Sequence, residues 1–221
     1  MRIPSGIPGL DKLIGGGFEE GTINLVTGKT GTGKSIFSMQ FLYNGAKNYN
    51  EKGLYITTGE VSKNIKKQAK TLGWDIDSLE KNGMLKIIEL EPYDIDKLIE
   101  KITLNKGFME AKRVVIDSVS MFELYIQDPY KIRKTLYSVL QKLRDMGKVV
   151  LAIAEVQEDS KNLSRFGVIE FMVDSVIVLQ YLEIAEHKRS LTIRKMRMTN
   201  HSTDIHPFEI GPDGIKVHSV A

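Results

Sequence analysis

The residues best suited to chemistry lie in a glycine-rich stretch near the amino terminus. Residues 28–35 read Gly-Lys-Thr-Gly-Thr-Gly-Lys-Ser, the pattern of a phosphate-binding P-loop. Such glycines let successive backbone N–H groups converge on an anion. Lys34 would reach the terminal phosphates of a nucleotide, and the Ser35 hydroxyl would ligate Mg²⁺. The remaining phosphate-binding positions are Thr30, Gly31, Thr32 and Gly33. The sequence therefore predicts a site for a nucleoside triphosphate with Mg²⁺.

A second metal ligand is predicted at Asp117. This aspartate ends the apolar run 114–116, and nucleoside triphosphatases hold Mg²⁺ with an aspartate at the carboxyl end of a buried strand. Many strands end in aspartate only as a turn or helix cap, so the pattern is weak by itself. Because a P-loop precedes it, we place Asp117 in the metal site with Ser35.

Two cations stand near the end of a strand predicted for residues 190–198. Strand periodicity places Leu191, Ile193, Lys195 and Arg197 on one face. Two apolar residues followed by two cations on the same face is an unusual pattern. A solvated end to a half-buried strand would also produce it, so the pattern alone leaves both interpretations open.

The elements that must position these residues follow a regular order. A strand over 23–27 and a helix over 36–43 flank the glycine-rich loop, which is the setting that the P-loop motif requires. Strands that alternate with helices predict an α/β fold with a mostly parallel central sheet and helices on both faces. Further strands are predicted over 53–58, 85–90, 113–118, 149–154 and 174–181, a helix over 129–146, and a C-terminal β-hairpin over 208–217.

Length and composition limit the classes of protein. The 221 residues, 42% hydrophobic and 27% charged, are typical of one globular core, so we expect a single domain over 1–221. A net charge of +3 is too small to indicate nucleic-acid binding by itself. The sequence has no cysteine, no apolar run long enough for a bilayer and no export signal, so we expect a cytoplasmic protein. The four histidines lack metal-ligand spacing.

Several motifs in a fixed order resemble those of one family. They are Gly6–Asp11 with Gly15–Gly17, the P-loop, Phe41–Gly45, Leu72–Asp75, Val114–Ser118 and Lys195–His201, the last reading K-x-R-x-T-x-H. Over nearly its full length the chain thereby resembles the KaiC-like branch of the RecA-type ATPases, in a single copy. The P-loop is generic, but the first and last motifs together are specific.

The resemblance implies a RecA-like P-loop core and a homo-hexameric ring that holds ATP between neighbouring subunits. It also implies that Lys195 and Arg197 reach the nucleotide of the next subunit, with Thr199 and His201 beside them. Cations supplied in this way neutralise charge that spreads over the transferred phosphoryl group. Hydrolysis would then depend on assembly.

The chain departs from the family pattern at the positions that govern the reaction rate. The family carries paired glutamates after its second strand, whereas this chain has Gly59-Glu60. Glu60 is the candidate general base, and a helix cap or a surface residue is the alternative. Ile153 and Ala154 stand where the family often has hydroxyl side chains, and Met198 replaces a glycine. These departures predict slow hydrolysis.

The leading hypothesis is a ring-forming ATPase whose nucleotide state regulates binding of an unknown protein partner. We expect no membrane among its partners. The alternatives are a nucleotide-dependent scaffold with little turnover, an autokinase, and a recombinase-like protein that binds single-stranded DNA. DNA binding would use the loop 157–166, with Phe166 as its only aromatic residue, and a stripe formed by Lys63, Lys66, Lys67 and Lys70. We favour a solvated face for this stripe, so nucleic acid is possible but not preferred.

Overall fold

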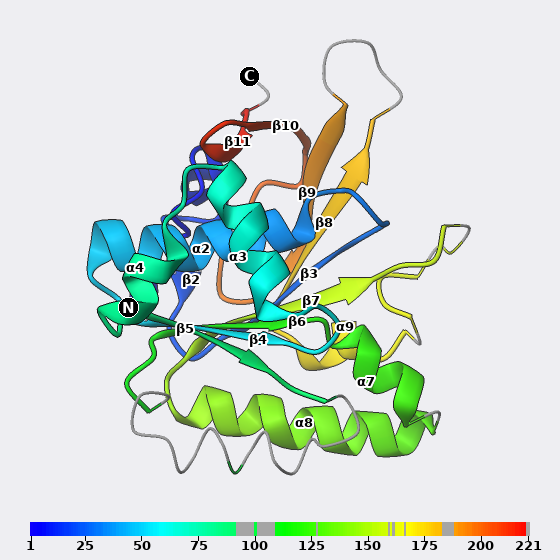
Figure 1. Cartoon of the computed structure of the whole chain (residues 1–221). Helices are drawn as coiled ribbons and strands as arrows, with labels where there is room; N and C mark the ends of the chain where they lie inside the picture. Colours follow the sequence, from blue (N-terminus) through cyan, green and yellow to red (C-terminus); the bar gives the residue numbers. More distant parts are fainter. Residues whose placement is uncertain are drawn as a thin grey trace.

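The central feature of the computed structural model is a sheet of nine strands (Figure 1). The structure describes residues 1–91, 100, 109–126, 128–158, 160, 162–165, 167–182 and 188–219. The strands are β3 (Ile23–Gly28), β4 (Gly53–Thr57), β5 (Leu85–Glu89), β6 (Arg113–Asp117), β7 (Val149–Glu155), β8 (Ser175–Tyr181), β9 (Arg189–Met196), β10 (Ile205–Gly211) and β11 (Gly214–Val217). Their order across the sheet is β11-β10-β9-β8-β3-β7-β6-β4-β5.

The sheet confirms the predicted α/β class. Strands β8, β3, β7, β6, β4 and β5 pair in parallel, and β9, β10 and β11 add to the β8 edge in antiparallel fashion. The predicted C-terminal hairpin is the β10–β11 pair, which closes where Gly211 faces Gly214. A short pair, β1 (Arg2–Ile3) with β2 (Phe18–Glu19), lies apart from the main sheet.

Helices cover both faces of the sheet, as predicted. Helices α2 (Lys34–Tyr49), α3 (Ser62–Thr71) and α4 (Ile76–Lys81) lie on one face, and α7 (Ser120–Tyr125) and α8 (Pro129–Asp145) lie on the other (Figure 1). Two short helices are α1 (Leu10–Leu13) and α9 (Ile169–Met172). Alternate residues of a strand enter different cores: Tyr55 packs with the α2 side, whereas Leu54 and Ile56 pack with the α8 side. In the part of the chain that the structure describes, no helix is both long enough and apolar enough to cross a membrane.

The local signals for helix α8 are confirmed. Asp128 caps its amino end by accepting hydrogen bonds from the backbone N–H groups of Tyr130 and Lys131. Pro129 is the first helical residue, where its missing N–H has no intrahelical partner to lose. Beyond the carboxyl end, Gly147 adopts a left-handed φ of 68°.

The prediction that Lys195 shares a face of its strand with Leu191 and Ile193 is wrong. Strand β9 ends at Met196, and its pairing with β8 shifts between Val176 and Ile177. Ile193 lies opposite Ile177, but Lys195 lies opposite Val176, so one residue of β9 is left over in the ladder. Such a β-bulge reverses the side-chain alternation. Lys195 therefore lies on the other face from Ile193.

Candidate nucleotide site

The P-loop connects β3 to α2 in a conformation that requires glycine. Gly31 and Gly33 have φ values of 77° and 104°, in the left-handed region that other residues rarely adopt. A Cβ atom on Gly28 would lie 2.1 Å from the carbonyl oxygen of Leu179. The glycines thus allow a tight loop against β8 at the amino end of a 16-residue helix, where the positive end of the helix dipole favours an anion.

Lys34 is the cation of this loop. Its side chain is buried, and its Nζ donates a hydrogen bond of 2.8 Å to the carbonyl oxygen of Lys29. Burial lowers the pKa of Lys34, and the carboxylates of Glu155 and Asp117 partly oppose that effect. A phosphate bound in the loop would supply the anionic partner that a desolvated ammonium favours.

Three carboxylates border one cavity beside the loop. Asp117 ends β6, which lies between β4 and β7, so the carboxyl ends of all three strands face the same region. A cavity of about 310 Å³ lies there, bordered by Asp117, Glu60 and Glu155 together with Ser35 of α2. Its other neighbours are Tyr55, Thr57, Gly59, Ile65, Ser118 and Met121. The structure therefore brings Ser35, Asp117 and Glu60 together, as the sequence predicted.

Glu60 is held at this cavity by its own hydrogen bonds. Its Oε1 accepts a 2.7 Å bond from Nε2 of Gln68. Burial, and then the charge of Asp117, raise the pKa of Glu60. The helix-cap alternative is wrong, because the N–H of Ser62 at the start of α3 donates to Glu89 instead. The role of Glu60 as a general base stays a prediction.

The donor atoms fit a magnesium ion. Mg²⁺ prefers oxygen ligands and is commonly held by one or two carboxylates with phosphate oxygens and waters. The Ser35 hydroxyl and the Asp117 carboxylate are such donors at the border of one cavity. Among the described residues, no group of three or more acidic or histidine side chains is arranged so that it could hold a metal ion by itself. Ser35 and Asp117 are therefore the residues that would hold Mg²⁺.

The predicted finger cations, Lys195 and Arg197, lie elsewhere. Lys195 Nζ donates to the carbonyl oxygens of Val173 and Glu170, at 2.6 and 3.1 Å. Burial, and then the charge of Arg197, lower the pKa of Lys195. Arg197 has a side chain that is 53% exposed and a long ion pair of 3.8 Å with Asp174. Arg197 is thus the more loosely held of the two.

Strand register shows how far these cations lie from the P-loop of their own chain. Met196 pairs with Ser175, and Ser175 pairs with Asn24 near the start of β3. The P-loop begins at Gly28, four residues beyond Asn24 along β3, which is about 13 Å at roughly 3.3 Å per residue. Arg197 follows Met196 in the direction away from the loop, so it lies at the opposite end of the sheet.

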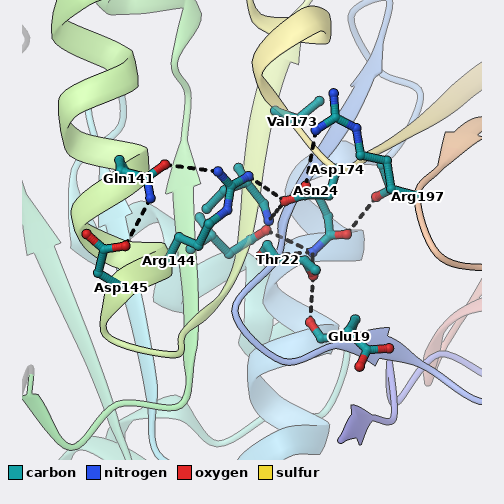
Figure 2. A network of polar contacts seen from close by, with 12 residues as sticks. Glu19, Thr22, Asn24, Gln141, Arg144, Asp145, Val173, Asp174 and Arg197 are labelled. Atoms are coloured by element: carbon teal, nitrogen blue, oxygen red, sulfur yellow. Dashed lines mark hydrogen bonds and ion pairs between the residues drawn. The ribbon is translucent and has the colours of Figure 1, made fainter.

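Asp174 is the centre of the network that supports Arg197 (Figure 2). Its Oδ2 accepts hydrogen bonds from the Ile23 N–H at 2.9 Å and from Arg144 Nη2 at 2.6 Å. Its Oδ1 pairs with the guanidinium of Arg197. The backbone N–H of Arg197 also donates to the Asp174 carbonyl oxygen. The network joins α8, the start of β3 and the turn after β9.

Arg2 of the amino-terminal segment holds Thr199. Arg2 Nη2 donates to Thr199 Oγ1 at 2.8 Å and to the Met198 carbonyl oxygen at 3.3 Å. The other guanidinium nitrogen of Arg2 donates to carbonyl oxygens of the glycine-rich segment that ends at Gly17. His201 Nδ1 contacts the carbonyl oxygen of Ser202. Thr199 Oγ1 also donates to the carbonyl oxygen of Arg197. Thr199 thus lies with Arg197, away from the P-loop of its own chain.

Among the residues of the cavity that sequence reasoning missed, two are titratable. Tyr55 was only a strand residue by its pattern, yet its hydroxyl donates a 2.5 Å hydrogen bond to Asp117 Oδ2. Glu155 ends an apolar strand, and its position on β7 beside β3 and β6 is the signal that could have found it. The neighbouring Ile153 and Ala154 are fully buried in the two cores, so they offer no polar group to the site.

The lysine stripe on α3 is partly neutralised. Lys66 forms ion pairs with Asp77 and Glu80. Lys63, Lys67 and Lys70 are exposed, which agrees with a solvated face. Phe166, the aromatic residue of the DNA-binding alternative, lies outside the described residues.

Comparison with known proteins gives a consistent result. The family model described as "ATPase: KaiC" matches residues 3–221. A UPF0273 protein of Thermotoga maritima is 38% identical, over 98% of this chain and 96% of the relative. A UPF0273 protein of Methanocaldococcus jannaschii is 35% identical with the same coverage.

Structural comparison agrees with the RecA-like prediction. The crystal structure of the KaiC-like protein PH0186 from Pyrococcus horikoshii matches with a TM-score of 0.89 and 39% identity, over 99% of each chain. The circadian clock oscillator protein KaiC of Synechococcus elongatus is 35% identical, and the match covers 96% of this chain but 43% of that protein. The chain thus spans less than half the length of the clock proteins that it matches.

Proposed function

Since the chain belongs to the KaiC family of RecA-type P-loop ATPase domains, we propose that it binds and slowly hydrolyses ATP at a site shared between subunits of a ring. The ring is a homo-hexamer, as the resemblance implies. Nucleotide state changes the contacts between subunits and thereby regulates binding of a protein partner. The ATPase reaction itself is a phosphoryl transfer to water.

The residues of one subunit have separate roles in this reaction. Lys34 and the backbone of the P-loop bind the phosphates, and Ser35 with Asp117 hold Mg²⁺. The metal ion, when bound, neutralises charge on the phosphate oxygens. Glu60 orients the attacking water and accepts its proton, because it borders the same cavity as Ser35 and Asp117.

The observation that carries the shared site is the position of Arg197. Roughly 13 Å of sheet separate the start of the P-loop from the strand end that precedes Arg197, so the side chain cannot serve the nucleotide of its own subunit. Its exposed guanidinium can instead face a neighbouring molecule. Thr199 lies in the same turn and would lie beside the neighbour's nucleotide.

Slow turnover follows from what the site lacks. Gly59 provides no carboxylate at the border of the cavity. Ile153 and Ala154 precede the last residue of β7, and their side chains have no group that could hydrogen-bond to the terminal phosphate or to water. Phosphate binding needs none of these positions, so tight nucleotide binding with low turnover is expected.

Substitution of Glu60 by Gln tests the proposal. We expect steady-state phosphate release to fall by about a hundredfold, the lower end of general-base contributions, with ATP affinity unchanged. In the unmodified protein the raised pKa of Glu60 places the acid limb of turnover above the ordinary glutamate value of 4.5, because the base form is lost as pH falls through that pKa. Equal turnover in Glu60→Gln would refute the role of Glu60, and turnover no faster than in buffer would favour a scaffold.

A further inference from the structure

The Tyr55 hydroxyl is a buried polar group that the proposed reaction does not use. Tyr55 is 1% exposed and lies on β4, one strand away from Asp117 on β6. In the ladder Thr57 pairs with Asp117, so Tyr55 lies two residues earlier and on the same face of the sheet. A buried hydroxyl in a native protein almost always has a hydrogen-bond partner, and here the partner is the predicted metal ligand.

From this geometry we infer that Tyr55 is a positioning residue for the magnesium site. Its Oη donates to Asp117 Oδ2 at 2.5 Å, which fixes the rotation of the carboxylate and leaves Oδ1 for the metal or for a metal-bound water. Groups that hydrogen-bond to metal ligands commonly fix ligand orientation in this way. The inference rests on the proposed function, because it assumes that Asp117 holds Mg²⁺.

A second contact of the Tyr55 hydroxyl supports this role. Ser38 of α2 also contacts this hydroxyl, so the P-loop helix, β4 and β6 meet at one oxygen atom.

A purely structural role would give a different result from a positioning role. A hydroxyl that only stabilises the core would change the melting temperature and leave the dependence on Mg²⁺ unaltered. A positioning hydroxyl changes the Mg²⁺ dependence of nucleotide binding and leaves metal-free binding unaltered, because Lys34 and the loop bind phosphates without Asp117.

The test uses Tyr55→Phe, which removes one oxygen and keeps the ring. Affinity for a fluorescent ATP analogue is measured in EDTA and across a Mg²⁺ titration, with melting temperature as a check on folding. We expect about tenfold more Mg²⁺ at half-saturation, with unchanged affinity in EDTA. The control is Tyr43→Phe, another buried tyrosine, which stacks on Trp74 and whose hydroxyl contacts Lys47 instead. This variant should match the unmodified protein.

A second variant shows whether Tyr55 acts through Asp117. In an Asp117→Ala background, Tyr55→Phe should change the Mg²⁺ midpoint no further, because the oxygen that accepts the Tyr55 hydrogen bond is already absent. A Tyr55→Phe titration that superimposes on the unmodified protein, or an equal loss of affinity in EDTA, would overturn the inference alone. An unmodified protein whose nucleotide binding ignores Mg²⁺ would overturn the proposed metal site as well.

Discussion

Gly59 is the residue at which the site differs most simply from the paired glutamates of the family that it resembles. Its φ is not in the left-handed region, and a Cβ atom there would lie 3.7 Å from Met121 Cγ and 3.9 Å from Met121 Sδ. These are ordinary van der Waals distances, so the position has room for a side chain. Neither strain nor crowding at Cβ requires a glycine here.

We therefore predict that Gly59→Glu raises turnover. A second carboxylate at the border of the cavity would help to orient water, and we expect about a tenfold increase, since Glu60 already supplies part of the effect. The measurement is steady-state phosphate release at saturating ATP and Mg²⁺. Gly59→Ala adds the Cβ atom without the carboxylate, and equal rates for the two variants would contradict the prediction.

At the scale of elements, the turn after β9 decides where the finger cations lie. The bulge between β8 and β9 turns Lys195 toward the carbonyl groups of Val173 and Glu170. Asp174 links the turn to the start of β3, because it bonds to both Arg197 and Ile23 (Figure 2). Met198 takes a φ of 54° at the position where the family motif has glycine. Met198 is 75% exposed, so packing of its side chain does little to offset this backbone strain.

Met198→Gly should accordingly stabilise the protein. Left-handed backbone costs a residue with a Cβ atom about 1–2 kcal/mol, and the greater freedom of glycine in the unfolded chain offsets about 0.4–1 kcal/mol. The free energy of unfolding in urea should rise by about 0.5 kcal/mol. Met198→Ala keeps the Cβ atom and should show no gain; a less stable Met198→Gly protein would mean that the Met198 side chain packs usefully in solution.

At the scale of the whole molecule, a shared site predicts complementation. A Lys34→Ala subunit has a damaged P-loop but keeps Arg197. An Arg197→Ala subunit lacks this cation but keeps an intact P-loop. Each variant alone should lose most of its turnover, since cations of this kind contribute about a thousandfold or more. When both are mixed, some interfaces combine an intact P-loop with an intact Arg197, and turnover should return.

The control for this mixture is its mass in solution with and without ATP and Mg²⁺. Mixed rings, detected with one variant tagged, must form before recovery can be judged. Mixed rings without recovered turnover would contradict a finger supplied between subunits. A monomer under both conditions would contradict the ring itself.

The sequence alone determined the parts of this protein that depend on local chemistry. The P-loop and its following helix were predicted because glycine spacing and a strand–turn–helix context carry the signal within a few residues. The α8 helix was predicted because Asp128, Pro129 and Gly147 mark its ends by local backbone preference. Asp117 followed from the rule that parallel strands present their carboxyl ends at one edge.

Only the tertiary structure decided the features that depend on pairing between strands. The bulge that separates Lys195 from Ile193 arises from register against β8, and alternation within β9 cannot reveal an unpaired residue. The bond from Tyr55 to Asp117 joins residues 62 positions apart, and strand order brings them together. For the same reason, the P-loop and Arg197 lie at opposite ends of the sheet, a separation that no local sequence pattern contains.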